Sequence, residues 1–310
     1  MPVSKLLLVI VVTLFITPLF QLNASNLPEK LLNMPISLTS GKVITLKQFQ
    51  GYKPVYLKFW ATWCVPCREQ MPHFEDVTQQ YGDDLEVIAI NLGINDDLKA
   101  VLKAQEEFSL SMPMAIDSNG DLAQAFRLLG TPYHLLFDKQ MNLVHIGHKA
   151  DSSLDNKIAL ISAGESLDLL ADGAINETEA ALTLSVDDNK PHALFFTATW
   201  CDWYFKDSRP EVSKQCIAAQ QSVNQFSVQY ENIAWQGIIS RLWTGQSELT
   251  RYIKKYKIKH PVEIDTSNSL FHQYMVKKIP SLVIVKNGKV LFQTSDFSDQ
   301  KSLVKQLSLL

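Results

Sequence analysis

Short apolar runs alternate with longer amphipathic stretches along most of the chain, which indicates strands that alternate with helices. In the first half, the strand-like runs are 55–59, 85–90, 113–116, 133–137 and 143–146, and the helix-like stretches are 64–81, 96–108 and 121–129. Pro72 predicts a kink near the start of the first of these helices. The pattern predicts an α/β domain with a three-layer α/β/α architecture and a mixed, partly parallel sheet.

The second half of the chain repeats the pattern of the first. The tetrapeptide Ala-Thr-Trp-Cys ends at Cys64 and again at Cys201, and an Ile-Asp pair ends 15 residues before both Pro132 and Pro280. Agreement at several points indicates a duplicated fold. The sequence therefore predicts two tandem domains of one fold and a linker between them, with the bounds 26–163, 186–310 and 164–185.

The first 25 residues form a separate segment. Lys5 precedes an apolar stretch at 6–20, and the small residues Ala24 and Ser25 follow. A membrane-spanning helix usually needs about 20 apolar residues, so we expect a cleaved signal peptide rather than an uncleaved membrane anchor. The protein is then expected in the periplasm, outside the cytoplasm, where disulfides persist.

Composition narrows the function classes only a little. The 310 residues, of which 46% are hydrophobic, are enough for two packed cores. A net charge of −3 gives no electrostatic reason to expect a nucleic-acid partner.

Two cysteines, Cys64 and Cys67, lie where an apolar strand gives way to a helix. Free N–H groups and the helix dipole favour an anion there, so we expect a lowered pKa for Cys64 and an exposed, nucleophilic thiol at the mouth of the fold. Cys67 lies one turn on, where it can close a disulfide or resolve a mixed one. Pro66 fits the first helical turn, and Arg68 adds positive charge.

The same spacing occurs in half of a zinc knuckle. A tetrahedral zinc site needs a second Cys or His pair, and the nearest candidates are His145 and His148. These histidines lie three residues apart in a strand-like run, so they face opposite sides. We therefore expect neither a metal nor another cofactor.

These motifs resemble the thioredoxin fold, and specifically the periplasmic thiol-disulfide oxidoreductases of the TlpA/ResA type, over roughly 30–163. The matching residues are Trp60, Trp63, Cys64, Pro66, Cys67, Pro72 and the pair Thr131-Pro132. The 68 residues from Cys64 to Pro132 resemble the central insertion of the extracytoplasmic branch. The resemblance implies a cis Thr131–Pro132 bond that faces the cysteines and presents Thr131 backbone groups to a substrate strand.

Two positions depart from the family pattern. Gln70 stands where the TlpA type usually has a glutamate, and Lys58 stands where thioredoxin has a buried aspartate. A buried, charged lysine would lower the thiol pKa, although desolvation would favour its neutral form. Alternatively, Lys58 extends to solvent from a half-buried strand.

The second domain does not keep the dithiol, because Tyr204 stands where the first domain has its second cysteine. Cys216 follows 15 residues after Cys201, about 22 Å in an unbroken helix and too far for a disulfide. Pro210 interrupts this stretch, and the interval from the cysteine to the repeated aspartate grows from 53 to 64 residues, so an inserted loop of about 11 residues could fold Cys216 back. A Cys201–Cys216 disulfide and two separate thiols both remain open.

Aromatic residues crowd the degenerate motif: Trp200, Trp203, Tyr204 and Phe205. They are either packing residues or the wall of a groove for an extended peptide, with Pro280 as the counterpart of Pro132. Trp235 and Trp243, in or beside a predicted strand, are most simply core residues.

The sequence thus predicts an extracytoplasmic thiol-disulfide oxidoreductase in which Cys64 attacks protein disulfides and Cys67 resolves. The resemblance implies reduction, a membrane or periplasmic electron donor, and cytochrome c maturation as one family role. The alternatives are a client-binding or assembly protein and a disulfide isomerase-chaperone, in which the second domain binds polypeptide.

Overall fold

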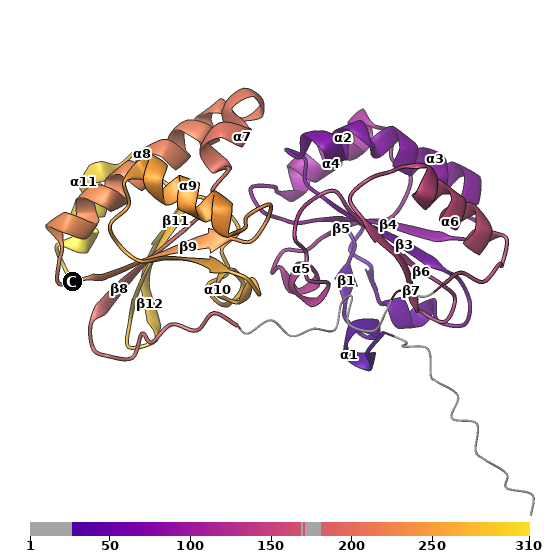
Figure 1. Cartoon of the computed structure of the whole chain (residues 1–310), viewed down its shortest axis with the longest axis horizontal. Helices are drawn as coiled ribbons and strands as arrows, with labels where there is room; N and C mark the ends of the chain where they lie inside the picture. The colour runs from indigo at the N-terminus through magenta and orange to yellow at the C-terminus, as the bar shows by residue number, and fades with distance from the viewer. Residues whose placement is uncertain (1–26, 169, 171–180) are drawn as a thin grey trace, which may run out of the picture.

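The computed structural model describes residues 27–168, 170 and 181–310. It contains two five-stranded sheets with flanking helices, drawn from indigo to magenta and from orange to yellow in Figure 1. The expected signal peptide at 1–25 lies outside the described residues, as do residues 169 and 171–180 of the expected linker.

The first domain comprises α1 (Glu29–Leu32), β1 (Ile36–Ser37), β2 (Val43–Ile44), a 3-10 turn (Leu46–Gln48), β3 (Val55–Trp60), α2 (Val65–Glu69), α3 (Met71–Tyr81), β4 (Glu86–Asn91), α4 (Leu98–Glu107), β5 (Met114–Ile116), α5 (Asp121–Ala125), β6 (Tyr133–Phe137), β7 (Leu143–Gly147) and α6 (Ser152–Ser162). The second comprises β8 (Pro191–Thr197), α7 (Cys201–Ser208), α8 (Pro210–Gln229), β9 (Ala234–Ser240), α9 (Gln246–Tyr256), β10 (Val262–Asp265), α10 (Ser269–Gln273), β11 (Ser281–Lys286), β12 (Lys289–Thr294) and α11 (Gln300–Leu307).

The two sheets have the same topology. The strand orders are β5-β4-β3-β6-β7 and β10-β9-β8-β11-β12, and each central strand is parallel to one neighbour and antiparallel to the other. In Figure 1 the longer helices lie above each sheet, and α5 and α10 lie below. The predicted α/β fold with mixed sheets is confirmed.

The central strands also pair in equivalent registers. Phe59 lies opposite Tyr133 in the first domain, and Phe196 lies opposite Ser281 in the second. These positions are offset by the same intervals as the two Ala-Thr-Trp-Cys motifs and the two proline sites. Residues around the cysteine motif and the proline of the first domain therefore have identifiable counterparts in the second domain.

Local sequence explains how the first site is built. All six residues of β3 are buried, as expected for a central strand covered on both faces. The predicted helix 64–81 is divided at Gln70 into α2 and α3, and Pro72 lies in the first turn of α3. The predicted helix 121–129 ends early, because Arg127 adopts a left-handed φ of 53° just after α5.

One apolar cluster runs through both domains. It includes Trp63, Phe126 and Tyr133 from the first domain and Trp200, Phe205 and Phe271 from the second. The contact between the domains is therefore a packed core rather than a loose surface contact. Within the described residues, no helix has the length and apolar character needed to span a membrane.

Candidate active site

Cys64 and Cys67 form a disulfide at the carboxyl end of β3, with 5.2 Å between their Cα atoms. Cys64 is the N-cap of α2, and its Sγ accepts a hydrogen bond of 3.2 Å from the Cys67 N–H. Pro66 occupies the first turn of α2, where its missing N–H costs no helical bond. An N–H directed at Cys64 Sγ favours the thiolate over the thiol in the reduced state.

The expected exposure of Cys64 is wrong for this arrangement, because both cysteines have an exposed fraction of 0%. The second domain packs over residues 64–67, the turn that carries the disulfide and is called the disulfide turn below. The Tyr204 hydroxyl accepts a 3.0 Å hydrogen bond from the Val65 N–H, and the Trp200 ring stacks on Trp63 at 5.3 Å between centroids. The sequence revealed the second domain but not that it covers the first.

Thr131–Pro132 is a cis peptide bond just before β6. Thr131 and Pro66 line the same groove, so the proline loop and the disulfide turn border one space. The Thr131 hydroxyl is buried without a hydrogen-bond partner among the described residues. Pro132 O accepts a 2.7 Å hydrogen bond from His148 Nδ1, so this histidine supports the proline loop.

Beneath the disulfide turn, Lys58 is fully buried, and the alternative that it reaches solvent is wrong. Its Nζ donates a 3.0 Å hydrogen bond to Gln70 O, where α2 ends, and lies 5.0 Å from the centroid of the Phe74 ring. Burial lowers the pKa of Lys58 from 10.5 to about 7. The Lys58 amino group thus titrates near neutral pH, close to the end of α2.

Sequence reasoning missed the polar groups beside Lys58. His134 Nε2 lies 2.9 Å from Gln70 Oε1, and His134 Nδ1 lies 2.6 Å from the Tyr56 hydroxyl. Burial lowers the pKa of His134 and raises the pKa of Tyr56, so both are neutral at pH 7. His134 therefore donates from Nε2 and accepts from Tyr56 at Nδ1. Tyr56 and Lys58 are two residues apart in β3 and so lie on the same face of the strand. This spacing is the signal that could have located the buried polar cluster of Tyr56, Lys58 and His134.

Arg68 and Trp63 hold the disulfide turn in place. Arg68 forms an ion pair with Glu107 and stacks on Phe108 at 4.9 Å, so part of its charge is neutralised away from the sulfurs. Trp63 Nε1 donates a 2.7 Å hydrogen bond to Ile94 O, which ties the turn to the loop after β4.

In the second domain, Cys201 and Cys216 form a disulfide with 6.0 Å between their Cα atoms, which resolves the open alternative. The predicted inserted loop is wrong. The chain turns at Arg209, α8 starts at Pro210, and the additional residues lengthen α8 to 20 residues against 11 in α3. Two helices in contact thus carry the two cysteines.

In the second domain, the backbone groups of Ile279 beside the cis proline, called the proline edge below, already have hydrogen-bond partners. Ile279–Pro280 is a cis bond, and the carboxamide of Asn95 accepts from Ile279 N–H at 2.9 Å and donates to Ile279 O at 3.2 Å. Asn95 N–H also donates to Lys277 O at 2.8 Å. A loop of the first domain therefore fills the place where an incoming peptide strand would lie, so Pro280 does not border an open site.

A groove with a volume of about 470 Å³ opens between the domains beside Pro66 and Thr131. Its second-domain lining includes the aromatic side chains Trp200, Trp203, Tyr204 and Trp243. Trp203 is 60% exposed. Trp243, expected in the core, packs against the core but is only partly buried, because it also lines this groove. It packs so closely on Gly130 that a Cβ there would lie 2.5 Å from Trp243 Nε1.

A buried ion pair joins the domains next to the disulfide turn. Arg209 donates to Asp96 Oδ1 at 2.9 Å and to the Thr62 hydroxyl at 2.6 Å. Asp96 has an exposed side-chain fraction of 0% and also accepts from the Thr62 N–H at 2.7 Å.

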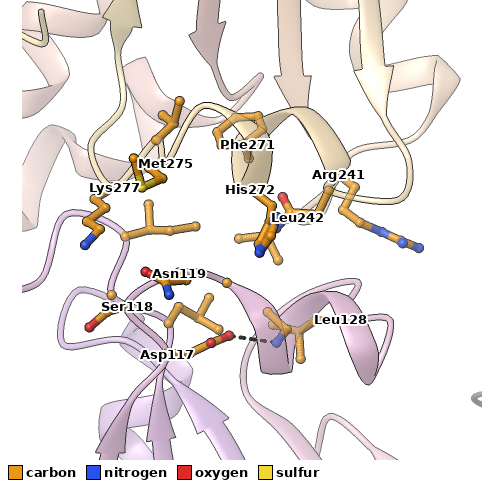
Figure 2. Close-up of a pocket in the computed structure, with 17 residues that line it drawn as sticks. Asp117, Ser118, Asn119, Leu128, Arg241, Leu242, Phe271, His272, Met275 and Lys277 are labelled. Carbon is orange, nitrogen blue, oxygen red and sulfur yellow. Dashed lines mark hydrogen bonds between the residues drawn. The ribbon is translucent and has the colours of Figure 1, made fainter. Parts of the chain in front are cut away.

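The repeated aspartates have structural roles. Figure 2 shows Asp117, Ser118 and Asn119 facing Phe271 and Met275 across a small cavity of about 30 Å³ between the domains. Burial raises the pKa of Asp117 to about 6, while its carboxylate accepts from the N–H groups that open α5. Asp265 makes the equivalent bonds at α10. The described residues contain no cluster of three side chains suited to a metal ion.

Comparisons with known proteins agree with this geometry. The family model of the AhpC/TSA family matches residues 25–146. The thiol-disulfide oxidoreductase ResA of Bacillus thuringiensis subsp. konkukian is 33% identical over 113 residues, which are 36% of this chain and 64% of that protein. The thioredoxin-like protein YneN of Bacillus subtilis is 31% identical over 124 residues, which are 39% of this chain and 72% of that protein.

Among solved structures, a secreted Mycobacterium tuberculosis disulfide oxidoreductase is similar at 18% identity with a TM-score of 0.39, covering 43% of this chain and 98% of the other. The chain spans less than two thirds of the ResA protein named above, and these two relatives match 36% and 39% of this chain. The chain has the Cys64–Cys67 pair and belongs to the thioredoxin-like thiol-disulfide oxidoreductases of the ResA type.

Proposed function

We propose that the whole protein is an extracytoplasmic thiol-disulfide oxidoreductase that reduces disulfides in client proteins. The observation that carries this proposal is the Cys64–Cys67 disulfide at the start of α2, where Pro66, between the two cysteines, lines the same groove as Thr131 of the cis-proline loop. The apolar segment at 6–20 supports a location in the periplasm.

The reaction has two exchange steps. The Cys64 thiolate attacks one sulfur of the client disulfide, a mixed disulfide forms, and the other client sulfur leaves as a thiolate. Cys67 then loses its proton and attacks Cys64 Sγ, which releases the second client sulfur. The client gains two electrons and two protons, and the protein is left with the Cys64–Cys67 disulfide. A membrane or periplasmic dithiol donor must supply two electrons to restore the thiols.

Neighbouring residues hold the reactants. Thr131 pairs with the client backbone through its N–H and C=O, and Pro66 and Trp63 fix the disulfide turn. Lys58, whose pKa is about 7, adds partial positive charge beneath α2 and lowers the pKa of Cys64. Lys58→Met should therefore raise the midpoint of iodoacetamide alkylation of Cys64 against pH, and an unchanged midpoint would contradict this role.

The test of the function uses the full chain with insulin as the disulfide substrate and dithiothreitol as the electron source. Cys64→Ser should abolish the catalysed reduction. The matched control is the double variant Cys201→Ser/Cys216→Ser, which removes the same number of disulfides from the other domain and should keep the activity. Equal rates for Cys64→Ser and the unmodified protein would refute the proposal.

The aromatic groove favours disulfide isomerase activity as a second candidate function. An exposed Trp203 beside the redox centre suits an unfolded polypeptide whose apolar side chains are accessible. An isomerase would restore activity to scrambled ribonuclease, whereas a reductase alone would only cleave its disulfides. A Trp203→Ser variant that restores scrambled ribonuclease as fast as the unmodified protein would exclude this second function for the groove.

A further inference from the structure

Access to Cys64 requires a movement that the structure helps to identify. Exchange needs direct contact between sulfur atoms, yet Cys64 and Cys67 have no exposed surface. Either the domains part or a side chain above the disulfide turn moves aside.

Tyr204 is the group best placed to move. Its hydroxyl is 3.0 Å from the Val65 N–H, in the turn between the two cysteines, and its ring meets the Trp63 ring edge-on at 6.2 Å. It is half-buried, and it lines the groove. In the repeat, this residue occupies the position of Cys67, but its side chain reaches over the other domain's redox turn.

Parting the domains would disrupt far more. It would break the buried pair of Arg209 and Asp96, the three hydrogen bonds between Asn95 and the second domain's proline loop, and the stack of Trp63 on Trp200. Rotation of Tyr204 breaks one hydrogen bond and the ring contacts of Tyr204 itself, but it leaves the contacts named above intact.

The two proline edges indicate what enters the groove. In the second domain, an amide group, the Asn95 carboxamide, bonds to both backbone groups of Ile279. The counterpart of Asn95 is Trp243. The backbone N–H of Trp243 donates to Leu129 O at 2.8 Å, just as the backbone N–H of Asn95 donates to Lys277 O. An indole has one donor and no acceptor, so Trp243 cannot fill the edge at Thr131.

The edge at Thr131 is therefore left for another amide group. The Thr131 hydroxyl is buried without a partner among the described residues, and the residue borders the groove. A peptide group can supply the hydrogen-bond partners that Thr131 lacks. The aromatic side chains of the opposite wall can pack against an apolar side chain next to that peptide group.

We propose that the groove between the domains binds an extended segment of the client polypeptide, and that this segment uncovers Cys64 by displacing Tyr204. The proposal rests on the proposed function. The client backbone pairs with Thr131, an apolar client side chain packs against Trp203 and Trp243, and a client carbonyl accepts the Val65 N–H that Tyr204 releases. The second domain thereby limits exchange to segments that fit the groove.

The first test measures how fast dithiothreitol reduces the Cys64–Cys67 disulfide, followed by alkylation and peptide mass. Tyr204→Phe loses only the hydrogen bond to Val65 and should react about fivefold faster, and Tyr204→Ala should react at least about tenfold faster. Tyr52→Ala, at a 77% exposed tyrosine of the first domain, is the control and should react at the original rate.

Equal rates for Tyr204→Ala and the unmodified protein would overturn the proposal. It would also be overturned if Arg209→Ala, which loosens the domain contact, were the only variant to accelerate. This reaction does not depend on a protein substrate, so it tests Tyr204 even if the protein fails to reduce insulin and the proposed function is wrong.

The second test measures KM and kcat for insulin reduction. Trp203→Ser should raise KM about tenfold with little change in kcat, because it removes binding surface and leaves the sulfurs untouched. Tyr52→Ser should leave both constants unchanged. An unchanged KM for Trp203→Ser would overturn the assignment of the groove as the client site.

Discussion

The two domains share a topology but differ in what lies beneath their equivalent sites. Under the first site the central sheet carries the buried pair Lys58 and His134, whereas the equivalent positions in the second domain are Phe195 and Leu282. The first domain keeps two cysteines one turn apart, and the second uses its disulfide to join α7 to α8. At these two strand positions, titratable groups occur only in the domain that has the Cys64–Cys67 pair, which indicates that they serve its chemistry.

The proline edges differ in the same sense. The Asn95 carboxamide bonds to both backbone groups of Ile279, whereas Trp243 offers no such amide to Thr131, which lines a groove. On the proposal above, one of the two equivalent sites accepts a peptide, whereas the other binds the neighbouring domain.

The largest effect is expected from replacing Lys58 by the apolar kind of residue that the second domain uses. The folded-state pKa of Lys58, about 7, lies below its ordinary value of 10.5, so between these values the unfolded chain binds more protons. The free energy of unfolding of the unmodified protein should then rise by roughly 4 kcal/mol between pH 7 and pH 10.5 relative to Lys58→Met. Urea unfolding at several pH values measures this difference, with Lys42→Met, at an exposed lysine, as the control. Parallel profiles for Lys58→Met and the unmodified protein would contradict the account.

The Cys201–Cys216 disulfide should contribute stability rather than chemistry. Removing it as Cys201→Ser/Cys216→Ser opens a loop closed across 15 residues and should lower the free energy of unfolding by about 3 kcal/mol. Urea unfolding monitored by circular dichroism measures the loss. A variant with unchanged stability but no insulin reduction would reverse the roles assigned to the two disulfides.

The ion pair between the domains should have a smaller effect. Arg209→Ala should lower the free energy of unfolding by about 2 kcal/mol, because Asp96 keeps the donors Thr62 and Asn91 when the guanidinium is lost. Arg209→Lys keeps the charge and should recover part of the loss. Tryptophan fluorescence in urea reports the contact through Trp63 and Trp200. No change in either variant would mean that the domains are held together without this pair.

The smallest effect is expected at the occupied proline edge. Asn95 has a left-handed φ of 53°, so Asn95→Gly keeps the backbone conformation and removes only the carboxamide. The loss should be about 1 kcal/mol in total, roughly 0.5 kcal/mol for each of the two hydrogen bonds to Ile279, because water can replace the carboxamide. Thermal unfolding of this variant and of Asn95→Asp, which keeps the acceptor but not the donor, would separate the two bonds. Equal stability of all three proteins would contradict the role given to this side chain.

Sequence alone predicted the elements around Cys64, because alternating strands and helices, Pro72 and the Ala-Thr-Trp-Cys repeat are local signals. It could not predict the burial of Cys64, since that depends on how one domain packs on the other. The strand position opposite Lys58 is filled by His134, which is 76 residues away in the sequence. The turn at Arg209 that joins Cys201 to Cys216 depends on helix packing rather than on a loop. Contacts between segments far apart in sequence therefore account for most of what was missed.

In the proposed reaction, Cys64 and Cys67 exchange electrons while Cys201 and Cys216 remain joined. A redox titration of the full chain with reduced and oxidised dithiothreitol, quenched by alkylation and mapped by peptide mass, follows both disulfides in one experiment. The account predicts a single two-electron transition in the peptide that carries Cys64 and Cys67, with Cys201–Cys216 intact through it. Reduction of Cys201–Cys216 first, with the other pair unchanged, would contradict it.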